Sequence, residues 1–198
     1  QVEPHLSVTG ACSAEWVPIR PKTDPAFLYA LVHVLLHEAA RERLDLAFLK
    51  QHTSSPYLVG ANGFFLRDAA SRKPLLWDLK RNAAVTHDTP GCDPALEGSF
   101  NCDAVEIGAD AEVLAQGRLE GSPSFAKLVA HVQPYSPEWA AGICDVPAET
   151  MRRIANEFLD HACVGETIEI EGMTLPYRPV SVSLGKTVNN GWGGFECV

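Results

Sequence analysis

The sequence lacks the signatures of several protein classes. Its 198 residues contain no C-x-x-C pair, and no cysteine and histidine group has zinc-finger spacing. The longest apolar run, Phe27 to Leu36, is interrupted by His33 and is much shorter than the roughly 20 residues of a membrane-spanning helix. Basic residues are few, since 16 Lys and Arg stand against 25 Asp and Glu. The formal net charge of −9 disfavours general nucleic-acid binding, because an acidic surface repels phosphate.

The composition is that of a globular chain. Hydrophobic residues make up 46% and charged residues 21%, and the length fits one domain or at most one and a half. The cysteines allow many disulfide pairings, among which the sequence does not choose: Cys12, Cys92, Cys102, Cys144, Cys163 and Cys197. The sequence starts at Gln1 without a signal-peptide pattern and ends directly after a glycine-rich turn, so we expect a segment of a larger protein.

Helical patterns occur toward both ends. A buried helix is predicted from Ala26 to Arg43, because its first part is apolar on nearly every side and Pro25 suits a first helical position. Thr23 or Asp24 can cap it. A short helix is predicted from Leu44 to His52, and further helices are expected at 122–132, 136–144 and 148–160.

Strand signals are short and separated by turn residues. They occur at Tyr57 to Val59, at Phe64 to Arg67 after a hairpin signal at Asn62-Gly63, and at Leu75 to Asp78. A second hairpin is expected at 167–170 and 173–175, followed by a strand from Val180 to Leu184 that runs into a Gly/Asn/Thr loop. Such a strand end is a usual ligand position in α/β proteins.

These patterns predict an α/β fold in three parts. Residues 1–52 form the first part of an α/β domain, 53–121 form an irregular surface insertion, and 122–198 form a helical segment, a hairpin and a strand that leads to a loop. The glycines, prolines and Asp/Asn turns of 53–121 favour the insertion over a core layer.

Two groups of chemically versatile residues have simple structural interpretations. His33 and His37 are four apart on a predicted helix, but no third ligand is visible, and no metal site is predicted. Glu157, His161 and Cys163 lie close in sequence and are interpreted as a helix end.

A helix-turn-helix outline spans Ala140 to Ile154, with Arg152 and Arg153 on its second helix. Because Glu149 and Glu157 lie on the same helix, a plain helix pair is favoured. A small acidic helix-turn-helix regulatory or binding module stays the alternative function.

Three separated stretches carry longer motifs. They are WVPIRPKTDPAF at 16–27, LAFLKQHT at 46–53, and YSPEWAA at 135–141 followed by VPAETMRRIA at 146–155. They resemble W-x-P-I-R-P-G-T-D-x-A-L, FV-x-x-H-T, and Y-T-P-E-W-A-A with G-V-P-A-E-T-I-R-R-I-A, which are signatures of the molybdopterin oxidoreductases, the dimethyl sulfoxide reductase family. The matches come in the family's order and account for the helix-turn-helix outline. Segments 55–60 and 66–78 resemble the branch near the phenylacetyl-CoA, thiosulfate and polysulfide enzymes.

The resemblance implies a Rossmann-like parallel-sheet domain of a multidomain molybdoenzyme. This domain would grip one of the two pyranopterin guanine dinucleotides that hold molybdenum or tungsten. Carried over by position, Asp24 would bind guanine, and Arg20, Pro21 and Thr23 would shape its pocket, with Lys22 at the place of a family glycine. A loop would run past the pterin or its phosphates through Gly185, Lys186, Thr187, Asn189 and Asn190. Many members have a histidine in that loop, which this sequence lacks, so no catalytic residue is assigned.

The resemblance also implies parts outside this sequence. A 4Fe-4S cluster motif and the protein ligand of the metal are expected upstream, and another domain would complete the dinucleotide sites. The implied partners are the cofactor, the remaining domains of the parent chain and an iron–sulfur electron-transfer subunit, without nucleic acid or a membrane span. The parent would perform two-electron or oxygen-atom transfer in anaerobic respiration, in the bacterial periplasm or a membrane-associated complex. The segment alone would be inactive.

Overall fold

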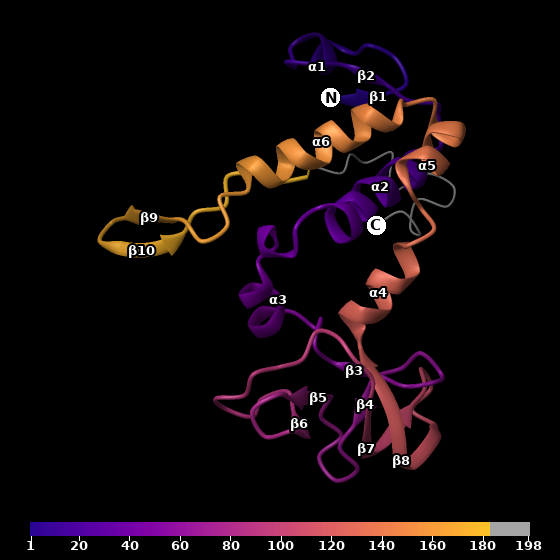
Figure 1. Cartoon of the computed structure of the whole chain (residues 1–198), viewed down its shortest axis with the longest axis vertical. Coiled ribbons are helices and arrows are strands. Elements are labelled where there is room, and N and C mark those ends of the chain that lie inside the picture. Colours follow the sequence, from indigo (N-terminus) through magenta and orange to yellow (C-terminus); the bar gives the residue numbers. More distant parts are fainter. Residues whose placement is uncertain (183–198) are drawn as a thin grey trace. The chain divides into compact units, whose positions relative to one another are not determined.

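The computed structural model describes residues 1–182, and the chain divides into two compact units (Figure 1). Unit 1 contains Gln1–Leu44 and the described residues from Val132 onward, and unit 2 contains Asp45–His131. Helices and sheets are both present, which confirms a mixed α/β composition. No helix in the described part of the chain combines the length and the hydrophobicity that a membrane crossing requires.

Unit 1 is mainly helical. Its longer helices are α2 (Asp24–His33), α5 (Pro137–Cys144) and α6 (Ala148–His161), and α1 (Val8–Ala11) is a single turn. The three longer helices bury a common core because each presents small or apolar residues inward. That core includes Phe27, Ala30, Ala140, Cys144 and Met151.

The helix predicted from Ala26 to Arg43 is wrong in its second half. After α2 the chain continues as a π-helix, η1 (Val34–Glu38), and Ala39 then turns to extended geometry before a 3-10 turn, η2 (Arg41–Arg43). Long-range contacts provide the physical reason. Glu38 binds Arg152 of α6, and Arg43 donates a 2.9 Å hydrogen bond to the Asn156 side chain.

The other helices of unit 1 confirm the predicted pattern. Ser136 caps α5 by accepting a hydrogen bond from the backbone N–H of Trp139, and Asp145 ends α5 in the left-handed region at φ 62°. Helix α6 follows directly after Pro147. Strands β9 (Thr167–Ile170) and β10 (Met173–Pro176) form the predicted second hairpin.

Unit 2 is built on an antiparallel sheet. Its strand order is β3 (Leu58–Val59), β8 (Val113–Pro123), β7 (Phe100–Ile107) and β4 (Leu66–Arg67). A separate hairpin is formed by β5 (Leu75–Asp78) and β6 (Ala83–Thr86). Helix α3 (Leu46–His52) precedes the sheet, and α4 (Ser124–Val132) follows it. The core of the unit consists of Leu58, Leu66, Leu75, Cys102 and Ala104.

The sheet corrects two expectations. Parallel pairing within residues 1–182 is limited to β1 (Val2–Glu3) with β2 (Val17–Pro18), so a Rossmann-like parallel sheet is not seen there. The stretch expected to be irregular contains β7 and β8, which the sequence patterns did not reveal. The inward positions of β7 are partly small, as at Cys102 and Ala104, and β8 contains two glycines, so neither segment has a strong strand signal.

The strand predicted at Val180 to Leu184 is not seen in its described part, since 180–182 form no strand. The rest of that prediction lies outside the described residues.

Candidate functional site

The loop from Arg20 to Asp24 joins β2 to α2 and holds the described residues that the resemblance assigns to the cofactor. The loop is closed by its own backbone, because the Thr23 N–H and hydroxyl both donate to the Arg20 carbonyl, at 3.3 and 2.6 Å. Thr23 therefore occupies the cap position of α2 without capping it through its side chain. Lys22 adopts φ 66°, a left-handed conformation that favours glycine.

Arg20 fastens this loop to the end of α5. Its backbone N–H donates to the Cys144 carbonyl at 2.9 Å. Its guanidinium forms a bidentate pair with Asp145, with Nε to Oδ2 at 2.9 Å and Nη2 to Oδ1 at 2.8 Å. The Arg20 side chain is thus engaged within unit 1 and shapes the loop.

Two charged side chains of the loop have no such partner. Asp24 is the first residue of α2 and half-buried, and its carboxylate makes neither a hydrogen bond nor an ion pair with any residue among 1–182. Lys22 is exposed and makes no ion pair in that range. A carboxylate and an ammonium two positions apart are therefore available to a ligand that offers both N–H donors and negative charge.

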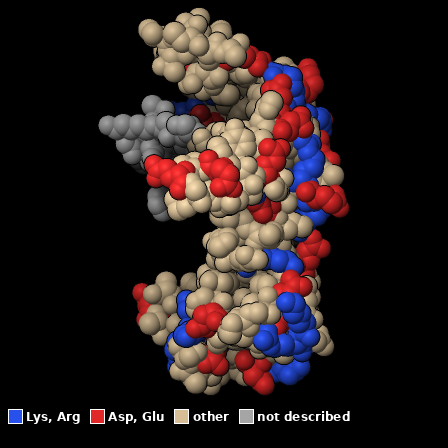
Figure 2. Space-filling view, turned by 90° about the vertical axis from the view of Figure 1, so that its left-hand side faces the viewer, with Lys and Arg blue, Asp and Glu red and all other residues tan. Residues whose placement is uncertain are grey.

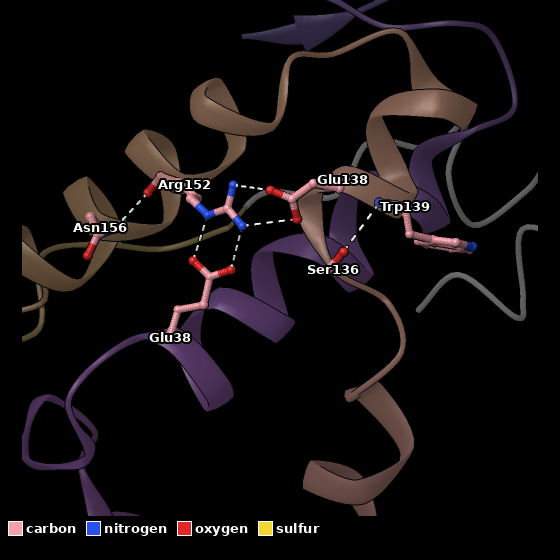
Figure 3. Close-up of polar contacts among 6 residues, drawn as sticks. All are labelled: Glu38, Ser136, Glu138, Trp139, Arg152 and Asn156. Carbon is pink, nitrogen blue, oxygen red and sulfur yellow. Dashed lines mark hydrogen bonds and ion pairs between the residues drawn. The ribbon is translucent and has the colours of Figure 1, made fainter.

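Arg152 connects three elements of unit 1 on another part of the surface (Figure 3). Its guanidinium binds Glu38 of η1 at 2.7 and 2.8 Å and Glu138 of α5 at 2.6 and 3.0 Å. The hydrogen bonds from Arg152 lower the pKa of Glu138 to about 2, and those to Glu38 and Glu138 raise the pKa of Arg152. The contacts bind helices together, which is a structural role.

Arg153 is paired in the same manner. It binds Glu15 at 2.6 and 2.8 Å and Glu157 at 3.0 and 3.1 Å. Figure 2 shows that blue and red side chains are interspersed over the face in view. Both arginines of the helix-turn-helix outline are therefore neutralised by carboxylates of their own unit, which supports the interpretation as a helix pair.

The predicted histidine pair is structural in its surroundings. The His33 ring is buried, its Nδ1 lies 3.1 Å from the Val132 carbonyl oxygen, and its centroid lies 4.9 Å from that of His37. Within the described residues, no group of three or more His, Cys, Asp or Glu side chains could hold a metal ion. Glu157 pairs with Arg153, and α6 ends at His161 as expected.

Unit 2 contains two buried carboxylates that the sequence patterns did not reveal. Glu106 accepts hydrogen bonds of 3.0 to 3.1 Å from Asn62 N, Asn62 Nδ2 and Phe64 N, and so holds the turn between β3 and β4. Asp78 accepts from Asp93 N and Lys80 N and pairs with Arg81. The hydrogen bond from Asp93 N, followed by those from Arg81 and Lys80, lowers the pKa of Asp78 to about 2 despite its burial. Acidic residues inside strands of apolar neighbours are the signal that could have identified both.

The predicted loop residues Gly185, Lys186, Thr187, Asn189 and Asn190 lie outside the described residues. Their assignment to a cofactor stays a prediction. Of the predicted site, the structure therefore describes Arg20, Pro21, Thr23 and Asp24, which it places in one loop.

Comparison with known proteins relates the chain to large oxidoreductase subunits. No protein-family profile matches it. It is 33% identical over 170 residues to a sulfite dehydrogenase subunit of Allochromatium vinosum, which covers 79% of this chain and 16% of that protein. It is 29% identical over 160 residues to the chlorate reductase alpha subunit of Ideonella dechloratans, covering 71% of this chain and 15% of that protein. It is 25% identical over 192 residues to the perchlorate reductase alpha subunit of Dechloromonas aromatica, covering 79% and 20%.

The chain thus spans no more than 20% of the length of these relatives. All three are subunits of enzymes named as a dehydrogenase or a reductase. The chain is therefore similar to one part of large oxidoreductase subunits, as the motifs predicted in general terms.

Proposed function

We propose that this chain is part of a molybdenum- or tungsten-dependent oxidoreductase, in which the loop from Arg20 to Asp24 binds the guanine end of a pyranopterin guanine dinucleotide. The similarity to the sulfite dehydrogenase subunit and to two reductase alpha subunits supports the reaction class. The ordered motifs at 16–27, 46–53 and 135–155 support the cofactor. When bound, such a cofactor supplies the two-electron or oxygen-atom chemistry.

The Asp24 carboxylate is the observation that carries the proposal. Guanine presents N1–H and an exocyclic amine side by side, and an ionised carboxylate can accept both hydrogen bonds at once. Adenine has no N1–H, so the same carboxylate discriminates between the two purines. Half-burial at the start of α2 strengthens such hydrogen bonds relative to open water.

The neighbouring residues fit the rest of a nucleotide. The exposed Lys22 ammonium can approach a phosphate, while Arg20 and Thr23 hold the loop in shape through their contacts with Asp145 and the Arg20 carbonyl. The loop residues from Gly185 to Asn190 would contact the pterin or its phosphates. A 4Fe-4S cluster and the metal ligand would belong to other parts of the parent protein, and an iron–sulfur subunit would exchange electrons with it.

The test uses the full-length protein, purified under conditions that retain bound cofactors. Molybdenum, tungsten and acid-released guanine nucleotide are measured for the native protein and for Asp24→Asn. We expect the native protein to contain metal and guanine nucleotide, and Asp24→Asn to retain about a tenth or less of both, since losing a charged, two-pronged contact costs on the order of 2–3 kcal/mol.

Asp110→Asn is the matched control, because Asp110 is exposed and has no ion pair in the described part of the chain. It should leave the cofactor content unchanged. A native protein without metal and guanine nucleotide, or an Asp24→Asn protein with full content, would contradict the proposal.

A further inference from the structure

The hairpin of β9 and β10 has two chemically different faces. Ile170 pairs with Met173, and Ile168 pairs with Leu175. Directly paired residues and alternate residues of a strand share a face, so these four side chains form one apolar face. The opposite face carries Thr167, Glu169, Thr174 and Pro176.

The apolar face is exposed in the chain as described. The exposed fractions are 38% for Ile168, 46% for Ile170, 56% for Met173 and 38% for Leu175. No third strand among the described residues joins this sheet. Figure 1 shows the hairpin beyond the C-terminal end of α6.

The hairpin is shaped without help from that face. Its turn residues, Glu171 at φ 51° and Gly172 at φ 78°, have the two positive φ angles of a type I′ turn. The Thr174 hydroxyl binds Glu169 on the polar face, and the Tyr177 N–H donates to the Glu166 carbonyl at the open end. A two-stranded hairpin is only marginally stable in water, and covering its apolar face would stabilise it.

The size of the face argues against a second, separate chain as its occupant. Four partly exposed side chains offer a few hundred Å² at most, whereas each partner of a stable complex buries about 800 Å². A segment of the same polypeptide does not pay the association entropy again, so a small apolar contact suffices. The relatives have ample chain for this, since the matched stretch is only 16% of the sulfite dehydrogenase subunit.

We infer that the apolar face of β9–β10, formed by Ile168, Ile170, Met173 and Leu175, is an intramolecular docking face for an apolar surface in another part of a longer parent polypeptide. This inference rests on the parent protein of the proposed function. It assigns the hairpin to domain–domain packing, separately from the cofactor loop.

Hydrogen exchange of the amides of 167–176 tests the inference, measured in the 198-residue chain and in the full-length protein. We expect exchange in the full-length protein to be slower by about tenfold or more, because docking suppresses local opening. The double variant Ile170→Thr/Met173→Thr should return it to the rate of the shorter chain. Threonine keeps a high strand propensity, so the hairpin itself is preserved.

Glu169→Thr is the matched control, since it changes the opposite face of the same strand and should leave the protection of the full-length protein intact. Equal exchange in the two proteins would overturn the inference. So would a concentration-dependent dimer of the 198-residue chain that the double variant dissociates, because the occupant would then be a second copy. Metal and guanine analysis is independent, so protected amides in a protein without cofactor would leave the docking face standing and reject the proposed function.

Discussion

Arg20 and Asp145 are 125 positions apart in sequence and form a bidentate ion pair at 2.8 and 2.9 Å. The pair joins the loop before α2 to the residue that ends α5. Asp145 has φ 62°, and aspartate is among the few residues that tolerate this region. The loop that presents Asp24 is therefore attached to a helix end that is distant in sequence.

Asp145→Asn should lower the free energy of unfolding of unit 1 only slightly. Asparagine keeps the left-handed preference, so the variant removes the charge alone. Both side chains are more than half exposed, at 53% and 60%, so we expect a loss of about 0.5 kcal/mol at low salt that disappears near 1 M salt. Urea unfolding at the two salt concentrations measures it, with Asp110→Asn as control. A loss that persists at high salt would show that the charge is not its cause.

Lys22→Gly should stabilise the chain and weaken nucleotide binding. Glycine relieves the left-handed strain at φ 66°, which exceeds its cost in the unfolded chain by roughly 0.5 kcal/mol. The variant also removes the ammonium proposed to approach a phosphate, so less guanine nucleotide should be retained in the full-length protein.

Lys127→Gly is the contrasting variant, because Lys127 lies within α4, where glycine costs about 1 kcal/mol. Denaturant unfolding compares the two substitutions. If Lys22→Gly destabilised the chain as much as Lys127→Gly, the strain argument would fail.

Gly60→Ala should destabilise unit 2. A Cβ at this position would lie 2.6 Å from the Glu106 carboxylate, which is buried and held by three donors, so it cannot move away freely. We expect a loss of about 2 kcal/mol, visible as faster hydrogen exchange in β7. Gly142→Ala in α5 meets no atom within 4 Å and should be neutral or stabilising.

Glu106→Gln tests the same turn from its other side. The amide group of glutamine would direct N–H bonds at the donors of Asn62 or Phe64, which costs about 1–3 kcal/mol in a buried site. An unchanged stability in urea would mean that the turn does not depend on this carboxylate.

The contribution of Glu138 to stability should depend on pH in acid. Its pKa is about 2 in the folded chain because of Arg152, well below the value of an unfolded glutamate. Its stabilisation is therefore complete above about pH 4.5 and is lost as the pH falls toward about 2. The difference in thermal midpoint between the native chain and Glu138→Gln should be constant near neutrality and vanish in that range.

Tryptophan fluorescence can follow this transition, since Trp139 is adjacent to Glu138. Glu149→Gln, at an exposed position without an ion pair in the described residues, should show a smaller difference that changes less between these pH values. Equal pH profiles for the two variants would remove Arg152 as the cause.

The site was only partly predictable. The motif at 16–27 led to Asp24 and to the loop that holds it, but nothing in the sequence indicated that Arg20 is engaged by Asp145 while Lys22 and Asp24 are not. The buried carboxylates Glu106 and Asp78 were missed, because a charged residue within a strand reads as solvent-facing until its neighbours are known.

The sequence by itself determined the local elements. Pro25, Ser136 and Pro147 mark helix starts, and Glu171-Gly172 marks a tight turn, because caps and turns act over a few residues. The tertiary structure alone decided where the helix of 26–43 breaks and how residues 100–123 pair. Glu38 meets Arg152 across 114 positions, and such contacts depend on where the chain returns in space, which no local pattern encodes.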